Sequence, residues 1–335
     1  MVSSRFLVTA LKAAAEPTRL RILALLATGE LNVKDLTRIL GQSQPRLSRH
    51  LKLLTEAGLV ERAREGSWVY FRLPHQNDHL AHALLRDLDR DDPVLARDRL
   101  RVDTVKRERE AAAQDYFEKQ AGNWDRIRTL HVAEADVETA MREAIGSAQI
   151  DLLVDVGTGT GRILELFADR YQRGLGFDLS TAMLAYARPK LDRAGISHAQ
   201  VRQGDIYDLP LADGSAGAVV MHQILHFLSD PARAIAEAAR LVAPGGKLLI
   251  VDFAPHENEF LRETQQHERL GFETATVSQW LTDAGLTVTD TRALAPQDKA
   301  GAAQLTVSLW LASQAPAKAQ PRSGSNATST LERTA

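Results

Sequence analysis

The stretch VDVGTGTG, residues 154–161, decides the fold of the C-terminal part of this chain. It connects an apolar run, 152–156, to a helical segment that begins near Arg162. Glycines at every second position let the backbone turn sharply and approach a ligand without hindrance from Cβ atoms. The free N–H groups at the start of the following helix would point at the same ligand. The stretch therefore predicts the strand, turn and helix that open a nucleotide-binding domain.

Apolar segments alternate with helical ones throughout the region that follows. The expected strands are 152–156, 174–177, 199–202, 217–221, 247–252, 286–292 and 304–311. Alternation of strands and helices is typical of a doubly wound, mostly parallel sheet. We therefore predict the α/β fold class, with a Rossmann-like sheet over residues 121–312 and an antiparallel last strand.

Three aspartates end the first three of these strands. Asp155 lies inside the glycine stretch, where a carboxylate would repel a pyrophosphate but could hold an ammonium group. Asp178 lies 21 residues beyond Gly157, at the position that hydrogen-bonds ribose hydroxyls in such folds. Asp205 ends the third strand, where it could accept from an adenine amino group. The glycine spacing is G-x-G-x-G rather than the G-x-G-x-x-G of dinucleotide folds, so an NAD-dependent dehydrogenase is disfavoured.

These residues and four further segments resemble the class I S-adenosylmethionine-dependent methyltransferases, in particular their quinone-biosynthesis branch. The segments are DLSTAML (178–184), LPL (209–211), HFLSDP (226–231) and LVAPGG (241–246), and the resemblance covers about residues 110–311. It implies that the ligand is S-adenosylmethionine, or S-adenosylhomocysteine as a signal. In that case Asp155 serves the methionine amino group, Asp178 the ribose, and Asp205 with Ile206 the adenine. The candidate cofactor-binding residues are Asp155, Gly157, Thr158, Gly159, Gly161, Asp178, Leu179, Met183, Asp205, Ile206, His222, Gln223 and Tyr116.

Other side chains near this site leave their roles open. His222 and His226 have the i, i+4 spacing of a metal pair, but no third ligand is evident, so we predict no metal and expect a pocket wall or a substrate-facing role. Tyr116 and Trp124 resemble the N-terminal lid of these enzymes, or they pack in the core. Methyl transfer needs alignment and exclusion of water rather than a particular residue type, so no catalytic residue is assigned. Asp252, His256, Glu257 and His267 are candidate general bases, although the default interpretation of these residues is a solvated surface loop.

The first 75 residues contain three short amphipathic segments separated by glycines. The second segment can be capped by Asn32 and ended by Gly41, and the third can be capped by Ser43 and ended by Gly58. The helix–glycine–helix junction has the spacing of a helix-turn-helix. Residues 59–73 then alternate around a glycine turn, which predicts a β-hairpin, or wing.

Three stretches of this module resemble the ArsR/SmtB-type winged-helix repressors over residues 8–75. They are EPTRLRIL (16–23), LSRHLKLL (47–54) and AGLV (57–60). The resemblance implies binding to a double-stranded DNA operator, with the third segment as the recognition helix in the major groove. The candidate DNA-binding residues are Gln44, Arg46, Ser48, Arg49, Lys52, Arg62 and Arg64.

Metal sensing by this module is disfavoured. Metal-sensing members of the family carry Cys-x-Cys where this chain has Asn32 and Lys34, and the chain contains no cysteine. Asp78, His79 and His82 resemble a second family site only loosely. We therefore expect neither a metal nor arsenite as the signal.

Basic charge is concentrated on the N-terminal module. Residues 1–75 carry 12 Lys and Arg against 6 Asp and Glu, residues 76–150 carry 12 against 16, and residues 151–311 carry 14 against 20. An excess of positive charge favours a phosphate backbone as partner over a use in protein contact alone. Neither a membrane span nor a secretion signal is expected. The lack of cysteine fits a cytoplasmic protein.

Residues 76–120 form a charged, alanine-rich connector, in which a long helix is expected from Val94 to Gln120. Its sparse apolar positions, Leu95, Leu100 and Val105, suit either a homodimer contact or a spacer. The tail 313–335 is rich in Ala, Pro, Ser and Thr, and it is expected to be disordered.

Two functions remain open on these grounds. The first is a dimeric transcriptional regulator whose methyltransferase-like domain binds S-adenosylmethionine or S-adenosylhomocysteine, with or without methyl transfer to a small molecule. The alternative is an active small-molecule methyltransferase whose winged helix serves dimerisation or autoregulation. DNA methylation is disfavoured, because MHQI (221–224) lacks the Asn/Asp-Pro-Pro-aromatic motif that those enzymes share.

Overall fold

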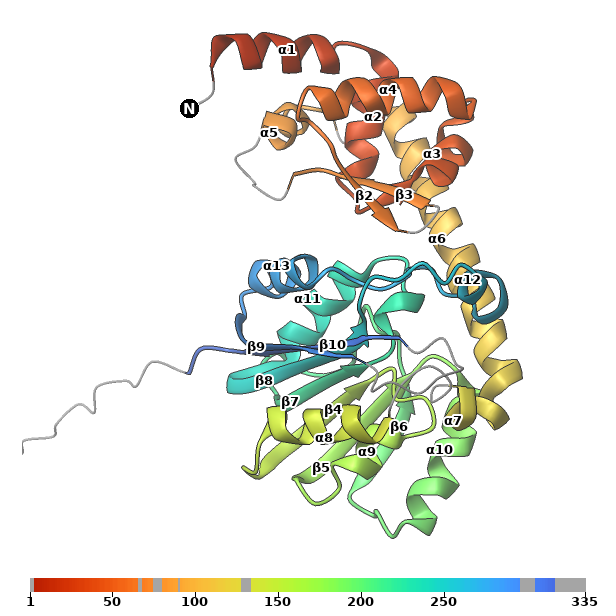
Figure 1. Cartoon of the computed structure of the whole chain (residues 1–335), viewed down its shortest axis with the longest axis vertical. Coiled ribbons are helices and arrows are strands. Elements are labelled where there is room, and N and C mark those ends of the chain that lie inside the picture. Colours follow the sequence, from red (N-terminus) through yellow and green to blue (C-terminus); the bar gives the residue numbers. More distant parts are fainter. Residues whose placement is uncertain are drawn as a thin grey trace, which may run out of the picture.

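The computed structural model describes residues 3–65, 68–74, 80–89, 91–127, 134–295 and 305–316. Figure 1 shows two parts, one above the other, with the long helix α6 (Pro93–Gln120) running along both. Four regions for which expectations were stated lie outside the described residues: the wing turn 66–67, Asp78 with His79, residue 304 and the tail beyond 316.

The N-terminal part is a winged helix-turn-helix, as predicted. Its elements are α1 (Ser4–Ala14), α2 (Pro17–Leu26), β1 (Leu31–Asn32), α3 (Val33–Leu40), α4 (Gln44–Glu56), β2 (Glu61–Glu65), β3 (Trp68–Arg72) and α5 (Leu80–Arg86). The small sheet has the order β1-β3-β2, and both pairings are antiparallel. Strands β2 and β3 form the expected wing.

Local capping defines the helix-turn-helix. The side chain of Asn32 accepts the N–H of Asp35 at 3.0 Å, and the Asp35 carboxylate accepts the N–H of Asn32 at 3.4 Å, which closes a capping box at the start of α3. Gly41 ends α3 with a left-handed φ of 64°, which a residue without a Cβ adopts without strain. Helix α4 then buries its stripe of three leucines.

Helix α1 is not predicted by the hydrophobic pattern. Only Ala10 and Ala14 of its residues are buried, and alanine adds little to an apolar periodicity. The larger side chains Leu7, Val8 and Leu11 are exposed instead.

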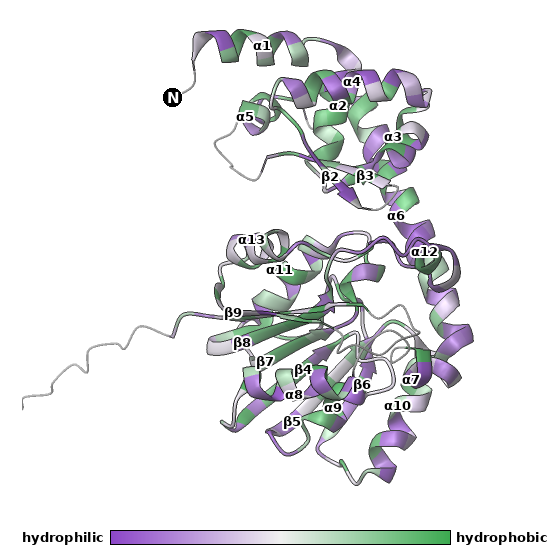
Figure 2. Ribbon diagram, viewed as in Figure 1, coloured by the Kyte–Doolittle hydropathy of each residue, from purple (hydrophilic) through white to green (hydrophobic). Residues whose placement is uncertain are grey.

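Helix α6 belongs to both parts of the molecule. Near its start, Asp98 pairs with Arg21 of α2 at 2.6 Å, and Val102 and Val105 lie in the core of the winged helix. Leu100 points to solvent, with 64% of its surface exposed. Figure 2 shows α6 as a largely hydrophilic ribbon beside the hydrophobic strands. The connector is therefore packed against the winged helix rather than being a free spacer.

The C-terminal part contains the predicted doubly wound sheet. Its strands are β4 (Ile150–Val156), β5 (Tyr171–Asp178), β6 (Ala199–Gln203), β7 (Ala216–His222), β8 (Val242–Phe253), β9 (Thr287–Leu294) and β10 (Val307–Ser313). The order is β6-β5-β4-β7-β8-β10-β9. The pairings from β6 to β8 are parallel, and β10 runs antiparallel to both of its neighbours. The antiparallel last strand is therefore confirmed.

Helices cover both faces of this sheet. One hydrophobic core joins the sheet to α8 (Glu134–Ile145), α9 (Arg162–Leu166) and α10 (Thr181–Arg193), and a second joins it to α11 (Pro231–Leu241) and α13 (Thr274–Asp283). The chain order reverses between β4 and β7, which is where doubly wound sheets bind ligands. The remaining short helices are η1 (Ala121–Asn123), α7 (Trp124–Ile127), η2 (Leu225–Phe227) and α12 (Phe260–Gln265). Within the described ranges, no helix is both long and apolar enough to span a bilayer.

Candidate functional site

Hydrogen bonds to the end of β5 fix the conformation of the glycine turn after β4. The N–H groups of Gly157 and Thr158 both donate to the carbonyl of Phe177, at 2.8 and 2.9 Å. Gly157 has a φ of 75°, and a Cβ there would lie 2.7 Å from Cγ1 of Ile224. Gly159, with a φ of 53°, donates its N–H to the Asp178 carboxylate at 2.8 Å. The turn is thus tied to the end of β5, and its backbone faces the switch point of the sheet.

A cavity lies over this turn, at the C-terminal ends of β4, β5, β6 and β7. Ten of the predicted cofactor residues line it: Gly157, Thr158, Gly159, Asp178, Leu179, Met183, Asp205, Ile206, His222 and Gln223. The other three predicted residues, Asp155, Gly161 and Tyr116, lie outside its lining. The structure therefore brings most of the candidate site together around one cavity.

Asp155 lies beneath the turn rather than in the cavity. Its side chain is 1% exposed, and its Oδ2 accepts the hydroxyl of Thr158 at 2.6 Å. Its Oδ1 has no hydrogen-bond partner within the described part of the chain. Burial raises the pKa of Asp155 to about 7, the nearby charge of Asp178 raises it further, and the Thr158 hydroxyl opposes the shift. The carboxylate is therefore poorly accommodated when it is ionised.

We expect Asp155→Asn to stabilise the unliganded chain at pH 8 by about 2–4 kcal/mol, and to have little effect near pH 4. Because the pKa is higher in the folded state, folding binds a proton between pH 4 and 7, so wild-type stability falls as the pH rises through that window. Above it, the wild type carries the full penalty of a buried charge, which the neutral amide lacks. Urea unfolding of both chains at several pH values measures the difference. Parallel pH profiles would contradict this account.

Asp178 is oriented by the backbone around it. One carboxylate oxygen accepts the N–H of Gly159 at 2.8 Å, and the other accepts the N–H of Ser180 at 2.9 Å. These bonds favour the ionised form, whereas burial is the larger effect and raises the pKa of Asp178. Asp205 differs, because it is exposed and accepts the N–H of Tyr207 at 2.9 Å. Both acids border the cavity.

Of the two residues expected in the lid, Trp124 lines the cavity and Tyr116 does not. Phe117 of α6 lines the cavity, while Tyr116 lies beside it, with ring centroids 6.0 Å apart. Phe117 packs edge-on against Phe227 at 4.7 Å and against Trp124 at 5.3 Å. A Cβ on Gly159 would lie 3.4 Å from Nε1 of Trp124, so this indole rests on the glycine turn.

Helix α6 supplies cavity residues that sequence reasoning missed. They are Glu110, Ala113, Gln114 and Phe117. Their spacing is i, i+3, i+4 and i+7, which places them on one helix face. Only Phe117 among them is large and apolar, so the usual signal of an amphipathic helix is lacking. A search for the i, i+3, i+4, i+7 spacing that included polar and small residues would have indicated this face of α6.

His222 and His226 have different surroundings: the first lines the cavity and the second belongs to a buried pair. His222 lines the cavity. His226 is 2% exposed, and its Nδ1 lies 2.7 Å from Oδ1 of Asp252, which is itself fully buried. The ring of His226 lies 4.2 Å from that of His267. The described residues contain no group of three side chains suited to a metal ion. Asp252 and His226 therefore hold the turn after β7 in place.

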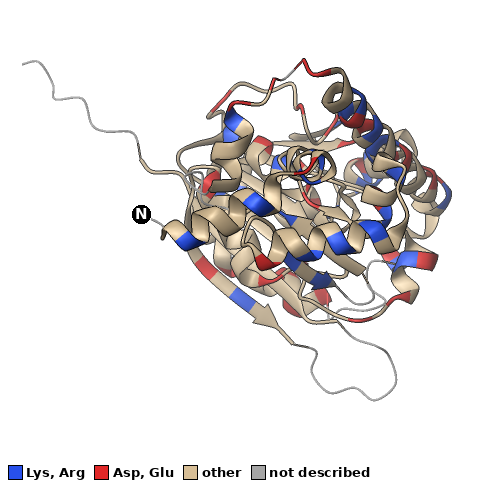
Figure 3. Ribbon diagram, turned by 90° about the horizontal axis from the view of Figure 1, so that it is seen from above, with Lys and Arg blue, Asp and Glu red and all other residues tan. Residues whose placement is uncertain are grey.

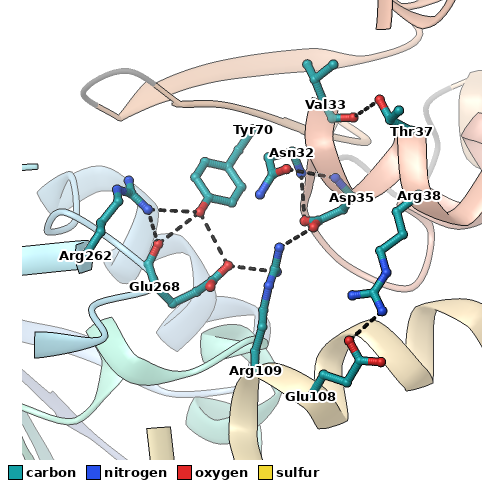
Figure 4. Close-up of polar contacts among 10 residues, drawn as sticks. All are labelled: Asn32, Val33, Asp35, Thr37, Arg38, Tyr70, Glu108, Arg109, Arg262 and Glu268. Carbon is teal, nitrogen blue, oxygen red and sulfur yellow. Dashed lines mark hydrogen bonds and ion pairs between the residues drawn. The ribbon is translucent and has the colours of Figure 1, made fainter. Parts of the chain in front are cut away.

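A polar cluster joins the winged helix to the C-terminal part, and we call it the joint (Figure 4). At its centre, Arg109 of α6 forms ion pairs with Asp35 of α3 and, at 2.8 Å, with Glu268. The side chain of Asp35 is 3% exposed and that of Glu268 is 11% exposed. Tyr70 of the wing donates its hydroxyl to the carbonyl of Glu268 at 3.0 Å, and Arg262 donates to the same carbonyl.

The loop that carries Glu268 also contacts the turn after β7. The N–H groups of Glu268 and Arg269 donate to the carbonyl of His226 at 2.9 and 3.0 Å. The Arg269 guanidinium lies 3.8 Å from the ring centroid of Tyr70 and pairs with Glu30 at 2.9 Å. This loop therefore connects a wall of the cavity to the base of the wing.

The predicted DNA-contacting side chains lie mostly on an open surface. Gln44, Arg46, Ser48, Arg49 and Lys52 are all exposed on α4. Helix α4 lies at the end of the molecule that is far from the large sheet (Figure 1), and Figure 3 looks down on that end and shows Lys and Arg along the nearest helices.

The two wing arginines differ in their surroundings. Arg62 and Arg64 are exposed on β2. Arg64 also borders a second cavity, between the wing and the C-terminal part, together with His256 and Glu257. This second cavity is separate from the cavity at the glycine turn, and the two share no lining residue.

The fold and the site together define a DNA-binding winged helix joined to a methyltransferase-type domain. Residues 16–62 match the family described as bacterial regulatory protein, arsR family, and residues 154–250 match a methyltransferase domain. The chain is 42% identical over 93 residues to the arsenic resistance transcriptional regulator ArsR1 of Pseudomonas putida, covering 27% of this chain and 73% of that protein. The chain therefore belongs to the arsR family, and it carries a methyltransferase domain behind the winged helix.

The second domain has relatives of its own. The chain is 31% identical over 144 residues to a probable S-adenosylmethionine-dependent methyltransferase of Mycolicibacterium smegmatis, covering 42% of this chain and 53% of that protein. The structure of the N-methyltransferase NodS from Bradyrhizobium japonicum, in complex with S-adenosyl-L-homocysteine, matches with a TM-score of 0.50 and 21% identity, covering 60% of this chain and 98% of that one. That likeness shows the fold alone. The chain spans about a third to a half of the length of several curated relatives.

Proposed function

We propose that this chain is a transcriptional regulator that binds operator DNA through its winged helix and S-adenosylmethionine or S-adenosylhomocysteine through its methyltransferase domain. The observation that carries the proposal is that one helix, α6, forms part of the winged-helix core and part of the cavity wall. A ligand in the cavity and DNA on α4 would therefore act on the same rigid element.

Two faces of α6 make this connection. One face carries Asp98, Val102, Val105 and Arg109, which contact the winged helix. The other carries the cavity residues, from Glu110 to Phe117. From Val105 to Phe117 the helix axis rises by about 18 Å. Because both faces belong to one continuous helix, a displacement of the cavity face would be transmitted to the winged-helix face.

The joint offers a second connection of the same kind. The turn after β7 has Phe227 in the cavity wall and the carbonyl of His226 in contact with the loop of Glu268. Glu268 in turn pairs with Arg109, which pairs with Asp35 on the first helix of the helix-turn-helix. A ligand that binds one arrangement of these groups better than another would shift the DNA affinity, at most by the ratio of its own affinities for the two arrangements.

A DNA-binding titration tests the proposal. The chain is titrated against its own promoter at fixed salt, without ligand and with saturating S-adenosylmethionine or S-adenosylhomocysteine. We expect at least one ligand to change the affinity about 5-fold or more. Arg49→Ala, on the exposed face of α4, should weaken DNA binding and leave ligand binding unchanged. Equal DNA affinity in all three conditions would refute ligand sensing.

We further propose that the regulator acts as a homodimer, because paired half-sites are the usual operators of helix-turn-helix proteins. The exposed Leu7, Val8 and Leu11 of α1 support a surface that a second copy would cover. Sedimentation should then give twice the mass of the 36.8 kDa chain. A monomer at micromolar concentration would contradict this proposal.

Methyl transfer to a small molecule is the second candidate function. It is supported by the cavity lining, which continues from the glycine turn to His222 at the end of β7 and to Phe227 and Leu228 beyond it. Incubation with labelled S-adenosylmethionine and panels of quinols, phenols and amines tests it. Absence of transfer to every panel would argue that the domain binds its ligand without turnover.

A further inference from the structure

Glu110 brings a carboxylate from the connector into the cavity. It lines the cavity together with Asp205 and Tyr207, and it is partly buried. It directly follows Arg109, the centre of the joint. Consecutive residues of α6 therefore serve the joint and the cavity.

The Glu110 carboxylate forms no hydrogen bond or ion pair within the described ranges, although two cations lie near it. Lys106 is engaged by Asp230 at 3.0 Å and by the carbonyl of Thr28 at 3.3 Å. The guanidinium of Arg233 lies over the ring of Tyr207, 4.9 Å from its centroid. Both cations are thus oriented by other groups.

The surroundings of Glu110 favour a ligand that donates hydrogen bonds. Burial raises the pKa of Glu110, and the charge of Asp205 raises it further. A partly buried carboxylate beside a second acid is costly unless a donor satisfies it. None of the described residues supplies such a donor, so water or the occupant of the cavity satisfies the carboxylate, and a ligand that presents an N–H group here would be favoured.

The neighbours of Glu110 indicate which end of the ligand it meets. Asp205 and Ile206 are the residues expected at the adenine, and Glu110 lines the cavity beside them. The exocyclic amino group of adenine carries two N–H donors. Two carboxylates on different elements, one after β6 and one on α6, could each accept one of them.

We propose that Glu110 is a ligand-contacting residue, which accepts a hydrogen bond from the exocyclic amino group of an adenine-containing ligand. This inference rests on the proposed ligand and adds a contact made by the connector itself. It gives α6 a direct interaction with the ligand, immediately beside the residue that holds the helix-turn-helix. The ligand would thereby help to set the position of the helix that both domains share.

Calorimetric titration of the full chain with two probes tests this contact. The probes are S-adenosylhomocysteine and S-inosylhomocysteine, in which a carbonyl oxygen replaces the amino group. We expect Glu110→Ala to bind S-adenosylhomocysteine about 10- to 100-fold more weakly than the wild type, as for the loss of a charge-assisted hydrogen bond. Its affinity for S-inosylhomocysteine should be unchanged or higher, because the carboxylate repels the carbonyl oxygen.

Two further variants separate contact from structure. Glu108→Ala, on the exposed side of the same helix, removes an ion pair with Arg38 and should bind both probes as the wild type does. Glu110→Gln keeps an acceptor oxygen and gains a donor, so it should lose most of the discrimination between the probes. Thermal unfolding should show that all variants are folded.

The outcomes distinguish this inference from the proposed function. Unchanged binding of S-adenosylhomocysteine by Glu110→Ala, or an equal loss for both probes, would overturn the contact while the ligand site stands. Binding of S-adenosylhomocysteine and of S-adenosylmethionine without any effect of either on DNA affinity would overturn ligand sensing and leave the Glu110 contact intact. No binding of either probe by the wild type would overturn the contact, and a failure to bind S-adenosylmethionine as well would overturn the proposed function.

Discussion

Replacing Arg109 by methionine should lower the free energy of unfolding by about 3–5 kcal/mol, the usual effect of removing one partner from a buried ion pair. The substitution leaves Asp35 and Glu268 buried without the cation between them. Methionine fills a similar volume, so the loss reflects unpaired charge more than a void. Urea unfolding followed by tryptophan fluorescence measures it, because Trp68 lies in the wing and Trp124, Trp280 and Trp310 lie in the other part.

The chain contains a matched control for this change. Arg38 of α3 and Glu108 of α6 form a pair between the same two helices, but their side chains are 55% and 51% exposed. Arg38→Met should therefore lower stability by less than about 1 kcal/mol. Figure 4 shows the two pairs close together. Similar losses for both variants would mean that burial does not govern the strength of the joint.

The loss in Arg109→Met should also depend on pH. Burial raises the pKa of Glu268, and the removal of a neighbouring cation would raise it further. At low pH the carboxyl group is protonated in the folded chain, so the unpaired charge disappears. We therefore expect a larger destabilisation at pH 8 than at pH 5, and the opposite trend would contradict this account.

Replacing Asp178 by asparagine should weaken ligand binding by about 100-fold or more. A carboxylate can accept the two ribose hydroxyls expected there, and each charge-assisted bond contributes about 1.5–3 kcal/mol. An amide has a single acceptor oxygen. It also cannot accept from both Gly159 and Ser180 as the carboxylate does, so the glycine turn loses part of its support.

Calorimetry with S-adenosylhomocysteine measures the effect of Asp178→Asn. Asp192→Asn, a charge-matched change at an exposed position of α10, serves as the control and should leave the affinity unchanged. Thermal unfolding of both variants checks that the domain is folded. A change of less than about threefold in Asp178→Asn would show that this carboxylate is not where the ligand binds.

The sheet and the glycine turn could be predicted because their signals are local. Alternation of apolar strands with helices, together with the glycine spacing, indicated the doubly wound sheet, and the strand ends differ from the expected ones by a few residues. Capping by Asn32 and the stop at Gly41 indicated the helix-turn-helix in the same way. Each single strand, turn or helix cap of this kind is specified by residues that lie close together in the sequence.

Which side chains line the cavity depends on the direction in which each side chain points, and a local sequence pattern does not determine that direction. One position along a helix turns a side chain by about 100°, and this is why Phe117 rather than Tyr116 lines the cavity. The role of His226 depends on Asp252, which lies 26 residues away on β8. Neither its spacing from His222 nor its apolar surroundings indicate a buried pair.

By itself the sequence determined that an arsR-type winged helix precedes a methyltransferase-type sheet with its glycine turn and acids. The tertiary structure decided how the two are connected. Arg109 and Asp35 lie 74 residues apart in the chain, and Glu268 comes from the loop between α12 and α13. Their pairing depends on long-range packing of α6 against both parts, which leaves no periodic trace in a helix of mixed charge. The connector, for which the sequence left a dimer contact or a spacer open, therefore contributes residues to both the joint and the cavity.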